Sequence, residues 1–404
     1  MRQIITHFTD DDLYKFTMCC AVIENYPRTQ VRYKFIDRDN AVYPGGFADE
    51  LQKQIILLEK IVITDEEIAF MKKRCTYIPS WFYSFLKGFR YNHKWVDVTQ
   101  DPSGHLDIEI SGCWSETILL EVKLLAIISE LSYIMTGEAK KLDYNRYYEL
   151  SWKKAERMLD AGCVFSDFGT RRRASFDAQD TAIRAMKECC DARKGSGNFV
   201  GTSNVYFAMK YDLTPVGTMG HELICAIAGM YGPLMANHIA MEVWAKTYRG
   251  ALGTFLYDTY GWRIFSLNFS EDFARMFKGV RVDSGDNKKE LDRIIAKYSS
   301  LGIDPHTKQV IFSNGLNVGD GIEIQKYAAG KCQASFGIGT HFTNDFPGIT
   351  PKNIVIKLIA VKITESWPFY SQTCKLSGEK GKHTGDEDVI RRFVETLHLN
   401  EEEA

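Results

Sequence analysis

Short apolar runs alternate with helical segments in the second part of the chain. Beyond Gly162 each run is rich in β-branched or aromatic residues, and a polar turn and a helical stretch follow it. Several runs are almost entirely apolar, as expected for strands of a parallel sheet that is covered on both faces. The pattern predicts an α/β barrel, with a doubly wound open sheet as the alternative. The predicted strands are residues 163–168, 199–202, 215–218, 280–282, 310–312 and 334–336.

The first part of the chain has a different pattern. Up to about residue 115, strand-like runs such as Val31–Ile36 mix with polar breaks and amphipathic pieces, as in an α+β domain. From Thr117 to Met135, apolar residues recur with helical spacing, so a long helix is expected to lead into the second domain. We therefore place an α+β domain over residues 1–125 and the barrel over residues 126–364.

Composition and charge argue against several classes of protein. Fifty basic and 52 acidic side chains give a net charge of −2, so no global attraction toward nucleic acid or anionic lipid is expected. The ten cysteines include no Cys-x-x-Cys pair, which favours reduced thiols in the cytoplasm. The first residues lack the apolar core of a signal peptide. The apolar stretch Leu223–Ala236 is too short to span a bilayer, and we expect a buried helix that ends or kinks around Gly229, Gly232 and Pro233.

Polar side chains follow nearly every predicted strand. Catalytic groups of α/β barrels lie at the carboxyl ends of the strands, so these positions are the candidates for a site. Small residues, hydroxyls, acids and arginines are expected to converge there on one rim. The segments are residues 167–173, 201–204, 217–222, 283–286, 313–317 and 337–340.

Three arginines, Arg171, Arg172 and Arg173, follow the first of these strands and are predicted to open a helix. Cations are disfavoured at the positive N-terminal end of a helix, so local propensity is overridden there. A bound phosphate explains the conflict, because helix N-terminal amides and guanidinium groups both bind it. The alternative is a solvated face on which the arginines pair with Asp177 or Asp180.

Two glycine turns are candidates for a phosphate site. Ser313, Asn314 and Gly315 follow one predicted strand, and Gly339 and Thr340 follow the next. Both turns supply main-chain amides and a hydroxyl at the place where barrels bind phosphate, although such glycines also serve tight turns alone. The sequence contains no P-loop motif, so any phosphate site must be built differently.

A cation and two acids surround the end of the predicted strand at residues 280–282. Arg281 and Asp283 are two positions apart and therefore project to the same face. They are candidates for substrate binding, with a buried ion pair as the alternative. Asp286 is a candidate for binding ribose hydroxyls or Mg²⁺, a cation that takes few protein ligands and keeps several waters.

His221 is the most informative histidine, because it follows Thr218 at a strand end and begins an apolar helix. An imidazole in that position can act as nucleophile or base. It does not begin a zinc-binding helix, since Cys225 stands where His-Glu-x-x-His needs its second histidine. The alternative for His221 is a capping or packing role.

Five ordered motifs resemble those of the nicotinate phosphoribosyltransferases, most closely the bacterial enzymes. The resemblance runs from residue 6 to about residue 378. It implies an incomplete α/β barrel of the type II phosphoribosyltransferase kind, packed on an α+β domain that a C-terminal segment, about 365–404, joins. It also implies a homodimer with shared active sites. The motifs are residues 9–18, 165–173, 217–222, 282–286 and 336–340.

The resemblance implies a reaction as well as a fold. Nicotinate and phosphoribosyl pyrophosphate would give nicotinate mononucleotide and pyrophosphate, as a step of NAD salvage. The reaction would be coupled to the hydrolysis of ATP through phosphorylation of His221, and Mg²⁺ would assist it. The enzyme alternatives are a nicotinamide or a quinolinate phosphoribosyltransferase, and the non-enzyme alternative is a non-catalytic nucleotide-binding homologue. Thr170 in Asp-Phe-Gly-Thr-Arg-Arg favours nicotinate, because the nicotinamide enzymes resemble Asp-Phe-Gly-Tyr-Arg at this motif.

Roles for individual residues near the ring and the pyrophosphate follow from the same resemblance. Phe168 and Arg281 are expected to cover the two faces of the pyridine ring, and Asp283 is expected to bind the ribose hydroxyls. Arg171 is expected to bind pyrophosphate, and we count Arg173 with it among the substrate-binding residues.

The remaining roles concern nicotinate and the 5-phosphate. Tyr14 is expected to reach the pyridine ring in the active site of the partner subunit, and Thr218 is expected to contact nicotinate. Residues 313–315, together with Gly339 and Thr340, are expected to bind the 5-phosphate.

Overall fold

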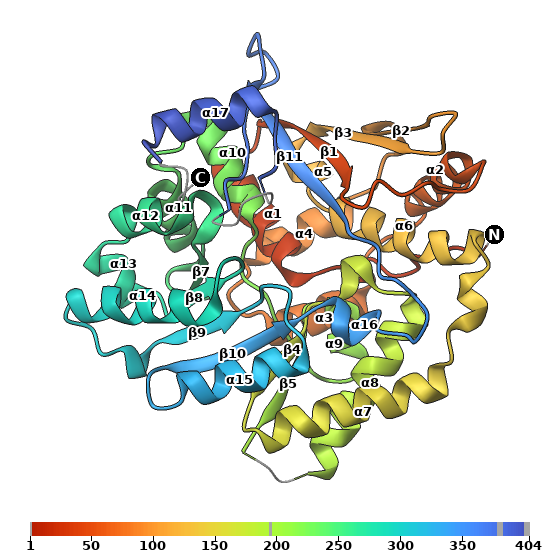
Figure 1. Cartoon of the computed structure of the whole chain (residues 1–404). Helices are drawn as coiled ribbons and strands as arrows, with labels where there is room; N and C mark the ends of the chain where they lie inside the picture. Colours follow the sequence, from red (N-terminus) through yellow and green to blue (C-terminus); the bar gives the residue numbers. More distant parts are fainter. Residues whose placement is uncertain (1, 194–195, 378–382, 400–404) are drawn as a thin grey trace.

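The computed structural model describes residues 2–193, 196–377 and 383–399. Its larger unit is an incomplete α/β barrel (Figure 1). Seven parallel strands hydrogen-bond in the order β6-β5-β4-β10-β9-β8-β7. Because β10 pairs with β4, the ring is interrupted between β6 and β7. The strands are β4 (Val164–Asp167), β5 (Asn198–Thr202), β6 (Thr214–Pro215), β7 (Thr254–Leu256), β8 (Gly279–Val282), β9 (Gln309–Phe312) and β10 (Gln333–Ile338).

The predicted incomplete barrel is confirmed, and each of the six predicted strands overlaps an observed one. The sequence prediction omitted β7. This strand is three residues long and entirely buried, so it shows no alternation that a sequence pattern could reveal.

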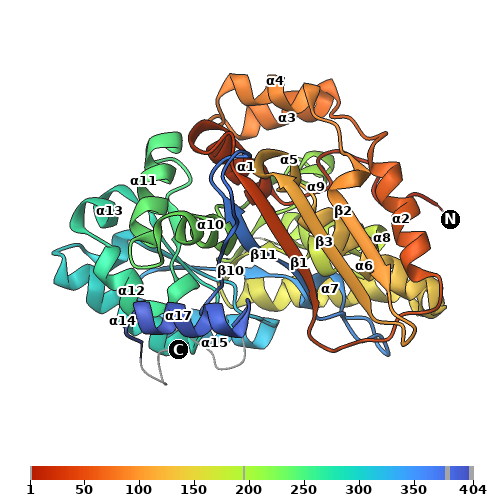
Figure 2. The same cartoon turned by 90° about the horizontal axis from the view of Figure 1, so that it is seen from above.

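A second, antiparallel sheet joins the two ends of the chain. Its strand order is β12-β11-β1-β3-β2, and β1 lies between β3 and β11. Figure 2 shows the blue β11 beside the red β1, although more than 300 residues separate them in the sequence. The strands are β1 (Gln30–Asp37), β2 (Val96–Gln100), β3 (Leu106–Cys113), β11 (Ile354–Lys362) and β12 (Ser371–Gln372).

The alternation in β1 explains how the second sheet packs. Val31, Tyr33 and Phe35 are buried in the core, whereas Arg32 between them is exposed. The return of the chain to this sheet begins with β11, ahead of the segment that we expected at about residue 365. Residues 378–382 and 400–404 of that segment lie outside the described residues.

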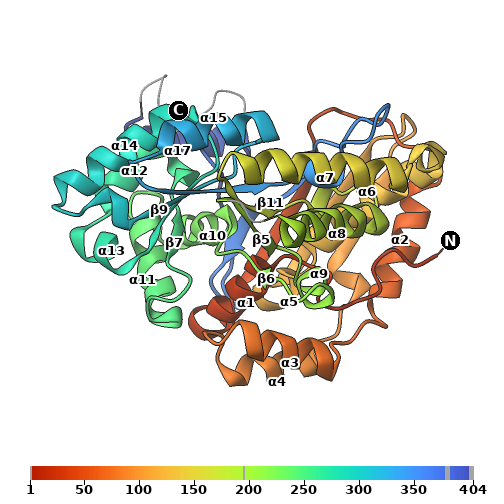
Figure 3. The ribbon, with the colours of Figure 1, turned by 90° about the horizontal axis from the view of Figure 1, so that it is seen from below.

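Helices cover both units. The predicted helix at residues 117–135 corresponds to α6, and α7 and α8 lie side by side along the barrel (Figure 3). The helices of the first part are α1 (Leu13–Asn25), α2 (Phe47–Leu58), α3 (Asp65–Arg74), α4 (Ser80–Gly88), α5 (Trp114–Thr117), α6 (Glu121–Met135) and α7 (Tyr144–Asp160). The later helices are α8 (Phe176–Ala192), α9 (Val205–Lys210), α10 (His221–Tyr231), α11 (Ala236–Tyr248), α12 (Gly261–Asn268), α13 (Glu271–Met276), α14 (Asn287–Ser300), α15 (Val318–Ala328), α16 (Thr340–Thr343) and α17 (Glu387–Thr396).

Residues 223–231 of the apolar stretch lie in α10, and residue 236 begins α11. As predicted, α10 is buried and ends before Gly232, whose φ is +88°. In the part of the chain that the structure describes, no single helix is long and apolar enough to cross a membrane. Only α10 and α11 taken together are long and apolar enough, by length and composition alone, and the two helices are bent by 117° where the chain passes from one to the other.

The N-terminal segment attaches directly to the first barrel strands. Backbone hydrogen bonds join Leu13 N to Ser203 O at 2.8 Å and Val205 N to Asp11 O at 3.0 Å. The buried ammonium of Lys123, on α6, donates to Phe8 O at 2.8 Å and to Asp10 O at 3.1 Å. The start of α1 is therefore fixed against the carboxyl ends of β4 and β5.

The close approach of β8 and β9 requires a glycine. A Cβ atom at Gly279 would lie 1.8 Å from the carbonyl oxygen of Gln309, which is backbone and cannot swing away. We expect Gly279→Ala to lower the free energy of unfolding by about 3 kcal/mol, the upper range for overpacking. Gly88→Ala is the control, because no atom lies within 4 Å of its added Cβ. Urea unfolding measures both; equal stabilities would contradict the strand packing.

Candidate active site

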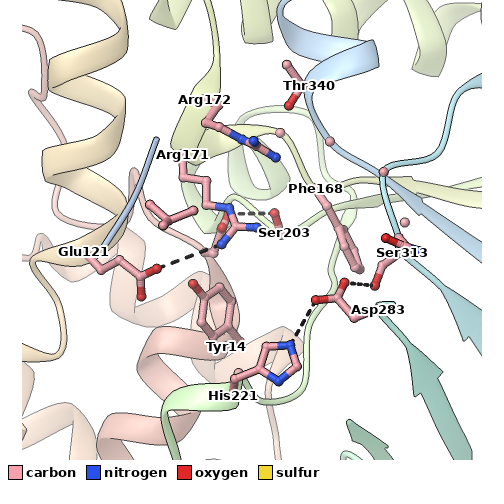
Figure 4. Close-up of a pocket in the computed structure, with 18 of the residues that line it drawn as sticks. Tyr14, Glu121, Phe168, Arg171, Arg172, Ser203, His221, Asp283, Ser313 and Thr340 are labelled. Carbon is pink, nitrogen blue, oxygen red and sulfur yellow. Dashed lines mark hydrogen bonds and ion pairs between the residues drawn. The ribbon is translucent and has the colours of Figure 1, made fainter. Parts of the chain in front are cut away.

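A pocket of about 680 Å³ lies where the carboxyl ends of the barrel strands face β11 and α1 (Figure 4). Its wall therefore combines the barrel rim with residues from both ends of the chain. Most of the residues predicted from the sequence line it. These residues are Tyr14, Phe168, Arg171, His221, Arg281, Asp283, Ser313, Asn314, Gly315, Gly339 and Thr340.

His221 begins α10 on the pocket wall and is almost fully buried. Its Nδ1 lies 3.0 Å from Thr259 Oγ1, while its Nε2 lies 3.1 Å from Asp283 Oδ2 and 3.0 Å from Lys375 Nζ. Burial and the positive charge of Lys375 lower the pKa of His221 to about 4. The imidazole is therefore neutral at neutral pH, and one ring nitrogen has a lone pair that can act as nucleophile or base.

Asp283 connects His221 to the turn after β9. The Ser313 hydroxyl donates to Asp283 Oδ1 at 2.5 Å, and the other carboxylate oxygen faces His221. Burial would raise the pKa of Asp283, but the positive charges of Arg281 and Lys375 hold it well below its usual range. Asp283 is therefore an ionised carboxylate in the pocket. No direct ion pair joins it to Arg281 within the described residues, so the buried-pair alternative is wrong.

Arg171 and Arg172 lie in a single 3-10 turn, Thr170–Arg172, and Arg173 follows it in extended backbone, so the arginine run is not at a helix start. The helix α8 begins only at Phe176, after the cap residue Ser175, so our prediction that the arginines open a helix is wrong. Arg171 and Arg172 extend into the pocket (Figure 4). The solvated-face alternative is wrong as well, because Asp180 pairs with Lys210 instead.

Arg38, Arg172 and Lys357 add positive charge to the same pocket. Burial, with the repulsion of Arg171 and Arg38, lowers the pKa of Arg172 to about 10. Burial, with the charges of Lys375 and Arg171, lowers the pKa of Lys357 to about 8. Within the described residues, none of the three has a carboxylate oxygen within 4.0 Å. Cations that repel one another in a pocket attract an anionic ligand.

Glycines in β10 and in the turn after β9 allow the backbone to border the pocket closely. A Cβ at Gly337 would lie 2.4 Å from the Phe168 ring, so this glycine makes room for the aromatic side chain. Gly315 has a φ of +57°, which favours glycine over other residues. The Asn314 side chain donates to Gly285 O at 3.0 Å and joins this turn to the one after β8.

Two family descriptions match most of the chain. The Nicotinate phosphoribosyltransferase (NAPRTase) family matches residues 163–396, and the N-terminal domain of that family matches residues 9–129. The chain belongs to the nicotinate phosphoribosyltransferase family.

Individual relatives agree with this membership over nearly their whole length. The nicotinate phosphoribosyltransferase of Chromohalobacter salexigens is 38% identical over 97% of this chain and 98% of its own. The crystal structure of the enzyme from Porphyromonas gingivalis has a TM-score of 0.93 at 38% identity, covering 98% of this chain and all of that chain. The structure from Vibrio cholerae has a TM-score of 0.89 at 28% identity, covering 98% of this chain and 94% of that chain.

Three residues that we predicted as site residues of this phosphoribosyltransferase do not line the pocket. Arg173 is fully buried, and its two Nη atoms donate to the two carboxylate oxygens of Asp10, each at 2.7 Å. Thr218 is buried between two lining residues, and its carbonyl oxygen accepts from Thr17. Asp286 caps α14, where its carboxylate accepts from the amides of residues 288 and 289. The Arg173 and Asp286 side chains therefore have structural roles.

Tyr14 lies in a different place from the one that we predicted. We expected it to reach the active site of the partner subunit, but it lines the pocket of its own chain (Figure 4). Its ring packs against Gly220, where an added Cβ would lie 3.1 Å from it. The fold explains this position, because α1 is fixed against the barrel rim by the hydrogen bonds of residues 11–13.

Sequence reasoning missed several cations of the pocket. Arg38 follows β1, Lys357 lies in the middle of β11 and Lys375 follows β12. None of them follows a barrel strand, which was the criterion for selecting candidates. The resemblance, which runs to about residue 378 and so includes Cys374-Lys-Leu-Ser377, was the one signal that could have pointed to Lys375.

The buried pair of Arg173 and Asp10 gives a stability prediction. We expect Arg173→Met to lower the free energy of unfolding by about 3–5 kcal/mol at pH 7, because Asp10 would be left as an unpaired buried charge. Burial alone would raise the pKa of Asp10, but Arg173 holds it below its usual range. The carboxylate therefore contributes stability above its unfolded pKa of about 4, and this contribution is lost as the pH falls through the lower folded value.

Arg172→Met is the matched control, since Arg172 lies one residue away without a carboxylate partner among the described residues. Its removal is expected to change the free energy of unfolding by less than about 1 kcal/mol. Urea unfolding at pH 7 and pH 4 measures both variants. Equal losses in the two variants would contradict the structural role of Arg173.

Proposed function

We propose that this protein joins nicotinate to the ribose 5-phosphate of phosphoribosyl pyrophosphate, forming nicotinate mononucleotide and pyrophosphate. The observation that carries the proposal is the composition of the pocket. More cations than carboxylates line it, the ionised Asp283 lies among them, and Arg38, Arg172 and Lys357 have no carboxylate oxygen within 4.0 Å among the described residues. The similarity to relatives named for this reaction, over nearly the whole chain, supports the same substrates.

The charges that develop in the reaction match this composition. Displacement at the anomeric carbon gives the ribose oxocarbenium character and puts negative charge on the departing pyrophosphate. A carboxylate is therefore useful near the ribose, and cations are useful near the pyrophosphate. Asp283 supplies the first, and Arg171 and Arg172 supply the second from the turn after β4.

Nicotinate itself needs orientation more than activation. Its ring nitrogen is an adequate nucleophile, so no base has to remove a proton before the attack. Phe168 and Arg281 border the pocket and would cover the faces of the pyridine ring, while Tyr14 borders it from α1. The turns at residues 313–315 and 339–340 would hold the 5-phosphate with main-chain amides. Such positioning supplies much of the rate.

We further propose that ATP phosphorylates His221 and that the hydrolysis of this phosphohistidine drives synthesis. The support is geometric. His221 is neutral, lines the pocket and shares it with the cations that would bind phosphate, and the chain has no P-loop for a separate ATP site. ATP would therefore occupy the same anionic subsites as phosphoribosyl pyrophosphate. The reaction would serve NAD salvage in the cytoplasm.

Mg²⁺ would accompany the phosphates of the substrates. Asp286 does not fit as its ligand, because the carboxylate caps α14 and lies outside the pocket lining. Among the described residues, no group of three histidine, cysteine, aspartate or glutamate side chains could hold a metal. We assign no residue of the chain to the cation. A homodimer also belongs to the proposal, with each pocket containing Tyr14 of its own chain.

Substrate choice tests the transferase. We expect nicotinate to exceed nicotinamide in kcat/KM by about a thousandfold, because charge-binding groups of the pocket would be left unpaired by the neutral amide. Steady-state turnover with nicotinate, nicotinamide and quinolinate, each with phosphoribosyl pyrophosphate, measures this ratio. Comparable values for nicotinate and nicotinamide would contradict the proposal, and a preference for quinolinate would support the alternative enzyme. No turnover of any of the three would favour a non-catalytic homologue.

Phosphorylation is tested separately with γ-labelled ATP. We expect an alkali-stable, acid-labile label on His221, which nicotinate and phosphoribosyl pyrophosphate remove. His221→Asn should abolish the label and the stimulation by ATP but retain ATP-independent synthesis, because the residues that position the two substrates remain. His341→Asn is the matched control, since His341 lines the same pocket but hydrogen-bonds neither Asp283 nor Lys375. Label on another residue would show that His221 is the wrong histidine.

A further inference from the structure

Lys375 is the charged group that contacts His221 from outside the barrel. Its side chain is 11% exposed, and its Nζ lies 3.0 Å from Nε2 of the imidazole. The other ring nitrogen, Nδ1, lies 3.0 Å from Thr259 Oγ1. The two nitrogens of His221 thus have partners from two different segments, which fixes the plane and the direction of the ring.

Backbone hydrogen bonds join these two segments. Leu376 N donates to Thr259 O at 3.0 Å, and Lys375 exchanges two backbone hydrogen bonds with Thr384, at 2.9 and 3.1 Å. The position of Lys375 is therefore set relative to Thr259 and not only by its long side chain. A lysine held in this way is suited to a precise contact with the ring.

The neighbours of Nε2 have opposite requirements. The Asp283 carboxylate, 3.1 Å away, can only accept, so it would need a proton on Nε2. The Lys375 ammonium can only donate, so it needs the Nε2 lone pair. One nitrogen satisfies one of them at a time. Asp283 also has the hydroxyl of Ser313 as a donor, and Asp258, the other acid near His221, accepts from Ser284 at 2.6 Å.

We propose that Lys375 is a catalytic residue for the phosphorylation of His221: its ammonium selects the tautomer in which Nε2 is unprotonated, and then binds the phosphoryl group that Nε2 accepts. In that tautomer Nδ1–H donates to Thr259 Oγ1, and the lone pair of Nε2 is directed to the pocket. This inference rests on the proposed phosphorylation by ATP.

The step balances without a further reactant. The lone pair of Nε2 attacks the γ-phosphorus of ATP, the N–P bond forms, and the bond from phosphorus to the β,γ-bridging oxygen breaks. ADP leaves with that electron pair. Nδ1 keeps its proton and its bond to Thr259, and the ammonium of Lys375 moves its hydrogen bond from Nε2 to a phosphoryl oxygen. No proton has to leave Nε2 before the attack.

The first test compares labelling rates. Lys375→Met should slow the labelling of His221 by γ-labelled ATP by on the order of a hundredfold, the size expected for one lost donor to a developing charge. Lys375→Arg keeps a charged donor and should label faster than Lys375→Met. Lys308→Met is the matched control, because Lys308 is also a largely buried lysine but donates to Phe277 O at 2.8 Å and does not line the pocket. It should label at the wild-type rate.

The second test reads the tautomer directly and does not require ATP. In ¹⁵N-histidine spectra, with the His221 signals assigned by their loss in His221→Asn, Nε2 of the wild type should be unprotonated and Nδ1 protonated. In folded Lys375→Met, Nε2 should carry the proton and donate to Asp283. A protonated Nε2 in the wild type, or an unchanged tautomer in Lys375→Met, would overturn the inference.

The two tests separate the possible failures. A wild type that takes no label but shows the expected tautomers would contradict the proposed phosphorylation and with it the catalytic role of Lys375, while its contact with Nε2 would stand. A wild type that labels normally, with Lys375→Met labelling at the same rate, would overturn the role of Lys375 alone. If Lys375→Met does not fold, the ¹⁵N-histidine spectra of the wild type and of Lys375→Arg test the inference: an unprotonated Nε2 would support it, and a protonated Nε2 would overturn it.

Discussion

The buried pair of Asp10 and Arg173 determines how the site is assembled. Both Nη atoms of Arg173 meet both oxygens of Asp10, so neither charge can leave the other without remaining unpaired in the core. The pair joins the N-terminal segment to the turn after β4. Asp10 holds the Arg173 side chain in the core, whereas Arg171 and Arg172 extend into the pocket. The same three residues thus hold the fold and supply the anion site.

The cations of the pocket repel one another, and the surrounding fold holds them in place. Glu121 offsets part of this charge, since it pairs with buried Lys15 at 2.5 Å and lies 4.0 Å from Arg171. The pKa values of Arg172 and Lys357 are lowered, which means that the pocket by itself destabilises their charged forms. A bound anion would relieve this destabilisation. Such a conflict between local stability and charge is expected at a functional site.

Much of the fold and part of the site could be predicted from the sequence. Apolar runs marked six barrel strands, and the polar residues after them marked His221, Asp283 and the turn at residues 313–315. These predictions succeeded because a strand and the residue that follows it are local in sequence. The motif resemblance then supplied the specific reaction and the incomplete barrel.

The rest depends on contacts that sequence spacing does not encode. Lys357 enters the pocket because β11 pairs with β1, a pairing across most of the chain, and a lysine in a strand gives no local sign of its burial. The inward direction of Arg173 depends on Asp10 in the same way. Asp286 is different: the capping of α14 by an aspartate before Asn-Lys-Lys-Glu was a local signal that we passed over in favour of a metal.

We propose that a pocket built from both ends of the chain and the barrel rim binds the phosphates and the ribose of one nucleotide. A crystal structure with nicotinate mononucleotide and pyrophosphate bound tests it most directly. We predict the 5-phosphate on the turns at residues 313–315 and 339–340, the ribose hydroxyls on Asp283 and the pyrophosphate beside Arg171 and Arg172. A nucleotide bound outside this pocket, or bound in it with its ribose away from Asp283, would contradict the proposed function of the pocket.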